Sequence, residues 1–316
     1  MKKIILIVLL LLSASGFFFY LEKKKVITWR FTIPFDSWFL TKIKNTTELR
    51  LAFLDIGQGD ATLITFPNQE KMLIDCARDR TVLSALGRNM HWYDRTIDYL
   101  VATHPDADHY GGCIDVLKRY RVRHIYFNGF DKEGSALLKE FHRTVQQEIT
   151  DGGADLTIVT TTHYLEIAST TLHFLYPDHA IMLDPRVPGV KEIESNNTSI
   201  VTRISYGNHD ILMTGDMEQP LEQYLLRSFG TTLQSEVLKV GHHGSISSSG
   251  EDFVKIVSPQ YAIISVGKNN SYGHPANRVL ARLERIKARV LRTDLLGDIL
   301  MTISTSSIYI NHGTTQ

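Results

Sequence analysis

Short apolar runs bounded by polar or turn residues recur along the chain from Leu49 onward. The runs are too short for buried helices and are separated by Gly- or Pro-containing turns, so they predict strands. Longer segments with apolar residues at three- and four-residue intervals, such as 135–149, predict helices. Strands are expected at 49–55, 60–66, 71–75, 97–103, 122–127, 156–159, 171–176, 198–206, 210–214, 235–240 and 262–266 and on to Ile310, and helices at 79–90, 112–120, 135–149, 220–229, 250–256 and 276–286. Strands and helices interleaved in two similar halves predict an α/β protein, a four-layer αββα sandwich.

The first part of the chain, residues 1–25, differs from the rest in hydropathy and charge. Lysines flank an apolar run from Ile4 to Leu21. Two interpretations stay open: a signal anchor that spans the membrane, or a signal peptide cleaved near Ser13–Gly16. We favour the anchor, which predicts a membrane-anchored, extracytoplasmic domain; the alternative is secretion after cleavage. Residues 26–48 are predicted to be a linker and 49–316 the hydrolytic domain described below.

Composition narrows the class of protein only slightly. The chain has 316 residues, of which 43% are hydrophobic and 22% charged, as in globular proteins. Its formal net charge is zero, so the bulk charge indicates no particular anionic partner. Cys76 and Cys113 are the two cysteines, which excludes a Cys-rich zinc site. Either a disulfide or two thiols is compatible with the sequence, and we expect two buried thiols, because free cysteine is usually buried.

Four ligand-type side chains follow the predicted strand 97–103 within six residues: His104, Asp106, Asp108 and His109. Alternate residues of an extended chain point the same way, so such a segment can direct several donors to one place. Gly111 and Gly112 permit the close turn that must follow. The pattern predicts a metal site rather than an ordinary acidic surface loop.

Further ligands are expected at the ends of later strands. Asp216 ends the apolar run 211–214 and is suited to bridge two cations. His242 and His243 directly follow the strand 235–240. We choose His242 as the metal ligand and His243 as a catalytic residue beside it, although the sequence does not distinguish the two. The predicted metal ligands are therefore His104, Asp106, Asp108, His109, Asp216 and His242.

Five ordered motifs resemble those of the metallo-β-lactamase superfamily, and more narrowly the hydrolase domain of the ComEC/Rec2 family of DNA-uptake proteins. They are Leu54–Asp60, His104–His109, Thr214–Asp216, Gly241–Ser245 and Tyr272–Pro275. They cover roughly residues 49–305. The resemblance implies an αββα fold and a metal-dependent phosphodiesterase or nuclease. A membrane channel accompanies such domains in full-length uptake proteins, and this sequence has one apolar run that could span a membrane. The resemblance therefore implies a catalytic domain, with a separate uptake channel as a candidate partner.

The chain departs from the superfamily pattern at two ligand positions. Asp106 stands where the superfamily usually has His, and Asn197 lies where a further His is expected. Replacing imidazole by carboxylate makes the site richer in oxygen, which favours Mn²⁺ or Mg²⁺. We expect two divalent cations and rank Mn²⁺ slightly above Zn²⁺.

The remaining site predictions concern catalysis and substrate contact. Asp108 or Asp216 is expected to orient the nucleophile, with Asp108 chosen as a catalytic residue, and His274 is expected to contact phosphate or protonate the leaving oxygen. His243 is expected next to the metals or facing substrate. Residues expected near the site or the substrate are Asn197, Gln58, Asp60, Ser245 and Tyr272.

Three functions compete at this stage. The leading hypothesis is a nuclease that acts on DNA outside the cytoplasm. The second is a phosphodiesterase for a small or cell-wall ester, such as a choline-phosphate ester. The third, a binding module with a decayed site, is disfavoured by the complete His104–His109 cluster.

Overall fold

The computed structural model describes residues 47–132 and 134–312. They belong to one compact unit that begins at Asn45. The predicted signal segment and nearly all of the predicted linker lie outside the described residues, so both stay predictions. Within the described part of the chain, no helix is long and apolar enough to cross a membrane.

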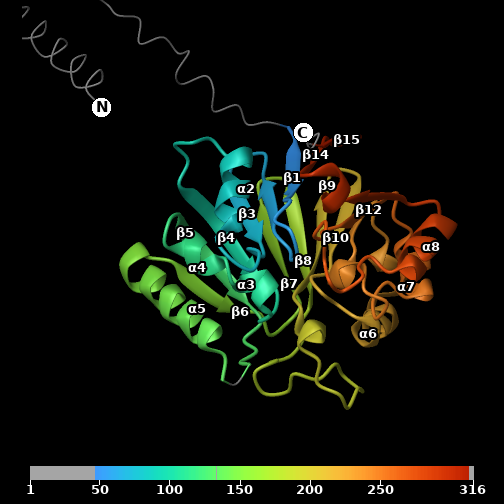
Figure 1. The fold of residues 1–316 in the computed structure, drawn as a ribbon, viewed down its shortest axis with the longest axis horizontal. Coiled ribbons are helices and arrows are strands. Elements are labelled where there is room, and N and C mark those ends of the chain that lie inside the picture. The colour runs from blue at the N-terminus through green and yellow to red at the C-terminus, as the bar shows by residue number, and fades with distance from the viewer. Residues whose placement is uncertain (1–46, 133, 313–316) are drawn as a thin grey trace, which may run out of the picture. The chain divides into compact units, whose positions relative to one another are not determined.

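Two sheets form the centre of the domain (Figure 1). The first has the order β15-β14-β1-β2-β3-β4-β5-β6 and the second the order β13-β12-β11-β10-β9-β8-β7. The strands of the first sheet are β1 (Leu49–Phe53), β2 (Thr62–Thr65), β3 (Lys71–Ile74), β4 (Thr96–Ala102), β5 (Arg121–Phe127), β6 (Asp155–Ile158), β14 (Ile299–Ile303) and β15 (Ile308–His312). Those of the second are β7 (His163–Ile167), β8 (Thr170–Tyr176), β9 (Val201–Tyr206), β10 (His209–Met213), β11 (Val237–Lys239), β12 (Tyr261–Ile264) and β13 (Arg289–Arg292).

Helices cover the outer face of each sheet. The longer helices are α2 (Thr81–Asn89), α4 (Cys113–Leu117) and α5 (Ala136–Gln147) on the first sheet, and α6 (Gln219–Phe229), α7 (Glu251–Val257) and α8 (Asn277–Arg285) on the second. Short turns of helix complete the described part: α3 (Ala107–Tyr110), α9 (Thr293–Leu296), a π-helical turn Glu148–Gly152 and the 3₁₀ turns Ser195–Thr198, Gly230–Leu233 and Gly241–Gly244.

Three apolar clusters hold these layers together. One packs α2, α4 and α5 on the first sheet, and another packs α6, α7 and α8 on the second. The third lies between the sheets and joins Leu51 and Ile74 to Ile211 and Ile263. Each sheet therefore buries both faces, which confirms the predicted four-layer αββα fold.

Strand direction places the chemistry at one end of the sandwich. β3, β4 and β5 are parallel in the first sheet, and β10, β11 and β12 are parallel in the second. Parallel strands end at the same edge of a sheet, so the loops that follow them gather there. This edge is at the lower end of the molecule in Figure 1, where α3 lies.

Cys76 and Cys113 form a disulfide, with 5.1 Å between their Cα atoms, so the prediction of two free thiols was wrong. The bond joins the segment after β3 to the first residue of α4 and closes 37 residues of chain. Gly112 makes the approach possible, because a Cβ at this position would lie 2.1 Å from the carbonyl oxygen of Cys76. The sequence could not reveal this long-range contact.

Candidate metal centre

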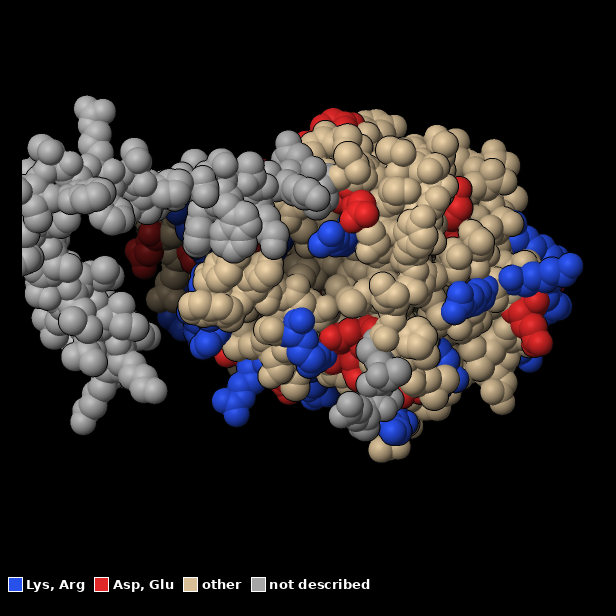
Figure 2. All heavy atoms as spheres, turned by 90° about the horizontal axis from the view of Figure 1, so that it is seen from above, with Lys and Arg blue, Asp and Glu red and all other residues tan. Residues whose placement is uncertain are grey.

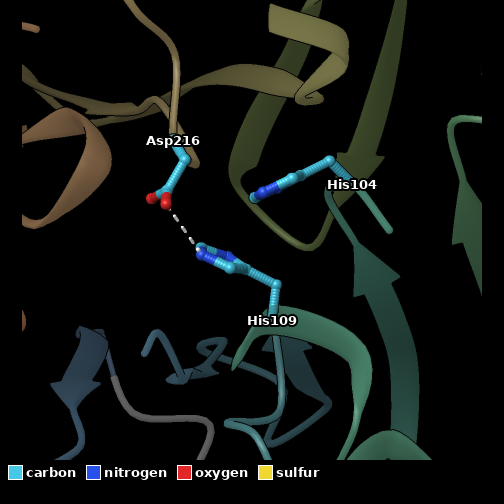
Figure 3. Close-up of side chains that lie close together, drawn as sticks. All are labelled: His104, His109 and Asp216. Carbon is cyan, nitrogen blue, oxygen red and sulfur yellow. Dashed lines mark ion pairs between the residues drawn. The ribbon is translucent and has the colours of Figure 1, made fainter. Parts of the chain in front are cut away.

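Side chains from five segments converge where the strands end. The segments are the β1–β2 loop, the chain that follows β4, α3, the turn after β10 and the 3₁₀ turn after β11. Figure 3 shows His104, His109 and Asp216 pointing toward one another. The side chains that gather here are Asp60, His104, Asp108, His109, Asp216 and His243.

The donor atoms fall into overlapping groups of metal-site size. His104, His109 and Asp216 place one donor atom each within 4.8 Å of one another, and so do Asp108, His109 and His243. Asp60 joins further groups, one with Asp216 and His243. Because the groups share members, their donors surround one continuous space with room for adjacent cations.

His109 is oriented by a buried carboxylate. Its Nδ1 donates to Asp75 Oδ2 at 2.8 Å, and its Nε2 faces Asp216 Oδ2 at 3.1 Å. Asp75 is itself fixed, since the amide and the hydroxyl of Thr103 each donate to it at 2.8 Å. A carboxylate behind a ligating imidazole is the usual outer support of a metal ligand.

His104 has its proton on Nδ1, as the surrounding hydrogen bonds require. This atom lies 3.1 Å from Thr103 Oγ1 and 3.3 Å from Ser199 Oγ. Both hydroxyls use their own protons elsewhere, on Asp75 and on the carbonyl of Asn196, so each accepts from the ring. The lone pair of His104 is thereby left on Nε2.

His243, which follows β11 of the second sheet, is oriented in the same way as His104 and His109. Its Nδ1 donates to the carbonyl oxygen of Ser265 at 3.0 Å, and its Nε2 lies 3.2 Å from Asp108 Oδ2 and 3.3 Å from Asp216 Oδ2. Asp60 Oδ1 lies 3.5 Å from this Nδ1, and Asp60 Oδ2 pairs with Lys239 Nζ at 2.6 Å. In all three histidines Nδ1 is held by the protein, and Nε2 points into the centre.

Several polar atoms in this centre are buried without a hydrogen-bond partner. They are Asp60 Oδ1, His104 Nε2, His109 Nε2 and Asp216 Oδ1. Unsatisfied buried polar atoms are costly and uncommon in folded proteins. Four of them around one space fit bound cations, because imidazole nitrogens and carboxylate oxygens are metal donors.

The electrostatics of the centre indicate an excess of negative charge. Burial lowers the pKa of a histidine, yet Asp216 and Asp75 outweigh it and hold the pKa of His109 well above its ordinary value. Burial likewise opposes the charged form of His243, but Asp216, Asp108 and Asp60 raise its pKa to about 10. Without metal, the carboxylates thus keep protons on the imidazole nitrogens, and bound divalent cations would displace those protons.

Gly59 allows the β1–β2 loop to enter the centre. Its φ is +124°, and a Cβ there would lie 2.4 Å from the carbonyl oxygen of Asp108. Asp60 can therefore donate its backbone N–H to that same carbonyl at 3.1 Å. The loop holds both the Asp60 carboxylate and the turn that carries Asp108.

Two predicted ligands lie at the rim and outside the donor groups, and their roles stay predictions. The Asp106 carboxylate accepts from Ser195 Oγ at 2.7 Å and from Lys132 Nζ at 3.1 Å. His242 Nδ1 lies 2.9 Å from Glu218 Oε1. His243, rather than His242, belongs to the donor groups, and both residues have positive φ in a turn where the strand alternation has ended.

The other predicted residues take varied places. Asn197 accepts from the backbone N–H of Glu218 at 3.0 Å, and Gln58 accepts from that of Gly267 at 3.3 Å. These two residues hold the surrounding loops. The Ser245 hydroxyl lies 2.9 Å from that of Ser247.

His274 and Tyr272 form an aromatic wall beside the centre. The half-buried His274 ring lies 5.6 Å from His242, centroid to centroid, and Tyr272 is stacked on it at 5.8 Å with much of its ring exposed. Burial, together with His242 and His243, lowers the pKa of His274.

Sequence reasoning missed several residues that hold the ligands. Thr103, Ser199 and Ser265 direct imidazole tautomers, and Glu218 holds His242. Lys239 is also buried and pairs with Asp60. A lysine at the end of an apolar strand was the available signal, because a buried lysine requires a partner.

Residues 54–268 match the sequence model of the metallo-beta-lactamase superfamily. The match covers more than half of the chain, and the chain belongs to this superfamily. Its fold and donor set are those of a metal-dependent hydrolase, with residues suited to divalent cations.

The relatives include a ComE operon protein and a competence protein, which confirms the ComEC-like resemblance. ComE operon protein 3 of Bacillus subtilis (strain 168) is 32% identical over 293 residues, 86% of this chain and 36% of that protein. Competence protein ComA of Neisseria gonorrhoeae is 31% identical over 252 residues, 79% of this chain and 32% of that protein. The chain therefore spans about a third of the length of these curated relatives.

A solved structure supports the fold. The metallo-beta-lactamase fold protein YhfI from Bacillus subtilis superposes with a TM-score of 0.52 at 12% identity, covering 84% of this chain and all of that one. At this identity the likeness shows the fold and carries no argument about the substrate.

Proposed function

We propose that the domain is a phosphodiesterase of the nuclease type that acts on DNA outside the cytoplasm. The observation that carries the proposal is the common orientation of His104, His109 and His243, whose Nε2 atoms face the carboxylates of Asp108 and Asp216. The name of one relative, a competence protein, points to DNA as the substrate.

The mechanism assigns separate tasks to the chain's own residues. Two bound divalent cations would supply Lewis acidity and lower the pKa of a water molecule. His104, His109 and Asp216 would hold one cation, and Asp108 and His243 supply donors for a second. Asp108, partly exposed where the others are buried, is placed to accept a proton from an attacking water.

A nucleic-acid strand has contacts available beside the centre. The exposed ring of Tyr272 offers a platform on which a base can stack. His274 stands between this ring and His242, where it can contact a phosphate. Lys268 and Arg278 are exposed on the same loop and the helix that follows it.

The disulfide supports the proposed location outside the cytoplasm. Disulfides persist in oxidising compartments and are rare where thiols are kept reduced. Together with the apolar run from Ile4 to Leu21, Cys76–Cys113 supports export and a membrane anchor. A separate DNA-uptake channel is the proposed partner, because the relatives are about three times longer than the matched part.

We further propose Mn²⁺ as the working metal, ahead of Zn²⁺. The centre combines three imidazoles with carboxylates from Asp60, Asp108 and Asp216, which makes it richer in oxygen than an all-histidine site. Metal analysis of protein purified without added metal tests this choice. Stoichiometric zinc that sustains full activity would contradict it.

A second function has one observation in its favour. A cavity of about 540 Å³ is lined by Glu192, Glu194 and Glu218, and Glu218 also contacts His242. Carboxylates repel a polyanion but suit a cationic group, such as the choline of a choline-phosphate ester.

A paired assay distinguishes the two functions. Single-stranded DNA, bis-p-nitrophenyl phosphate and p-nitrophenyl phosphorylcholine are compared with Mn²⁺, for the native chain and for Asp108→Asn. The nuclease proposal expects cleavage of DNA and of the simple diester, both lost in the variant. Turnover of the choline ester without action on DNA would select the second function.

A further inference from the structure

We propose that the end of the domain opposite the metal centre docks on the surface of an anionic lipid bilayer. The docking surface consists of the loop 91–95 and the neighbouring segment 119–121. It is distinct from the metal centre and does not depend on the proposed catalytic function.

Aromatic rings gather at the tip of this loop. Trp92 is 82% exposed and Tyr93 65% exposed. Tyr93 is stacked on His91 at 5.3 Å and touches Trp92 edge-on at 5.7 Å, so three rings are contiguous. Trp and Tyr are the residues that favour the boundary between lipid and water.

Basic side chains lie beside these rings. The Arg121 N–H donates to the Arg95 carbonyl at 2.8 Å, and the Arg95 guanidinium lies 5.8 Å from the Tyr120 ring centroid, which joins the two segments. The nearby carboxylates are already neutralised, Asp94 by Lys71 and Asp98 by Arg123.

Three exposed guanidinium groups therefore remain for an external anion. Arg95, Arg119 and Arg121 form no ion pair within the described part of the chain. Figure 2 looks down on this end of the domain, where uncharged atoms predominate and Lys, Arg, Asp and Glu side chains are scattered among them. Basic residues around aromatic ones complement anionic headgroups.

The docking surface lies at the far end of β4 from the metal centre, which favours a membrane contact over a substrate contact. The loop precedes β4 and His104 follows it, so the seven residues of the strand put about 23 Å between the tip and the metal centre. A DNA strand on the loop would not be held at the catalytic residues.

The N-terminal part of the chain reaches the domain at this same end. β1 and β3 are both antiparallel to β2, and β3 is parallel to β4, so Leu49 and Thr96 begin their strands at one edge. The sequence that precedes Leu49 contains the apolar run predicted to enter the membrane. A domain resting on this end would present its metal centre away from the bilayer.

Fluorescence quenching tests the proposal with the full chain reconstituted in vesicles. Vesicles of phosphatidylglycerol or of phosphatidylcholine carry brominated acyl chains that quench nearby tryptophan. The chain has three tryptophans, so the difference between the native protein and Trp92→Phe isolates Trp92. We expect Trp92-dependent quenching in phosphatidylglycerol that weakens in phosphatidylcholine and in high salt.

Two variants give the matched comparison. Arg119→Gln with Arg121→Gln should lower the docked-to-free ratio by about tenfold or more, since each basic residue contributes to anionic-surface binding. Tyr164→Ala, 66% exposed on β7, removes an equally exposed aromatic ring and should leave the quenching unchanged.

Two results would overturn the proposal. One is equal quenching of the native chain and Trp92→Phe in phosphatidylglycerol. The other is quenching of Trp92 by a single-stranded oligonucleotide without any by brominated lipid, which would assign the surface to nucleic acid. An unchanged urea-unfolding midpoint of Trp92→Phe shows that the variant is folded.

Discussion

Replacing Asp75 by asparagine should weaken metal binding, although Asp75 is not a proposed ligand and acts by orienting His109. The Asp75 carboxylate is buried and accepts hydrogen bonds from the Thr103 amide, the Thr103 hydroxyl and His109 Nδ1. Asparagine keeps the shape but turns one acceptor into a donor. Either two donors then face each other, or His109 moves its proton to Nε2, the atom that should bind the cation.

The expected magnitude follows from these contacts. Loss of the partner behind a ligating imidazole typically weakens metal affinity about 10- to 100-fold. This corresponds to about 1.4–2.7 kcal/mol of binding free energy. The fold should also lose about 1–3 kcal/mol of unfolding free energy, because a buried donor is left without an acceptor.

Asp98→Asn is the matched control. Asp98 is also a buried carboxylate; it accepts from the Lys71 amide at 2.8 Å and pairs with Arg123 at 2.7 Å, outside the donor groups. Mn²⁺ dissociation constants come from competition with a chelating dye, and fold stability from urea unfolding in EDTA. Asp75→Asn binding Mn²⁺ as tightly as the native chain, or Asp98→Asn weakening it equally, would refute the reasoning.

Three further predictions concern fold stability. Burial raises the pKa of Glu222 from 4.5 to about 7, so between these pH values the folded state holds a proton that the unfolded state has lost. The free energy of unfolding should therefore fall by about 3 kcal/mol as pH rises from 4.5 through 7. Urea unfolding of Glu222→Gln should lack this dependence on pH, and the same dependence in the variant would contradict the prediction. Lys239→Met should cost about 3–5 kcal/mol by leaving Asp60 unpaired, with part recovered when Asp60→Asn is added. Replacing Cys76 and Cys113 by serine should lower unfolding free energy by about 3 kcal/mol, because the bond closes a long loop; a smaller loss than 1 kcal/mol would show that the loop is held by other contacts.

The sequence predicts the fold well where the hydrophobic period is strong. The buried strands β4 and β10, which lead to His104 and Asp216, are apolar runs, and the structure has strands where they were predicted. β7 was not predicted, because it is an edge strand with alternating exposed residues. The turn to β8 contains Ala168 with a positive φ of 52°, where a glycine would have been the usual signal.

The site could be predicted only as far as strand geometry extends. His104 and His109 follow from their places after β4, but the choice between His242 and His243 depends on a 3₁₀ turn with φ of 46° and 52° at the two residues. Neither strand nor helix periodicity applies to such a turn. The supports of the site come from distant segments, as when Ser265 fixes the tautomer of His243, and a single sequence contains no record of that contact.

The charge of the centre supports a preference for phosphodiesters over phosphomonoesters. Once bound cations have displaced the imidazole protons, Asp60, Asp75, Asp108 and Asp216 are opposed within the chain by one buried cation, Lys239, which leaves negative charge in excess. Two divalent cations would turn this excess into a single positive charge, which a singly charged diester neutralises and a doubly charged monoester exceeds. The kcat/KM with Mn²⁺ should therefore be higher for bis-p-nitrophenyl phosphate than for p-nitrophenyl phosphate, although the monoester carries no second ester group to obstruct its approach. Faster hydrolysis of the monoester would mean that the centre holds more positive charge than these residues allow.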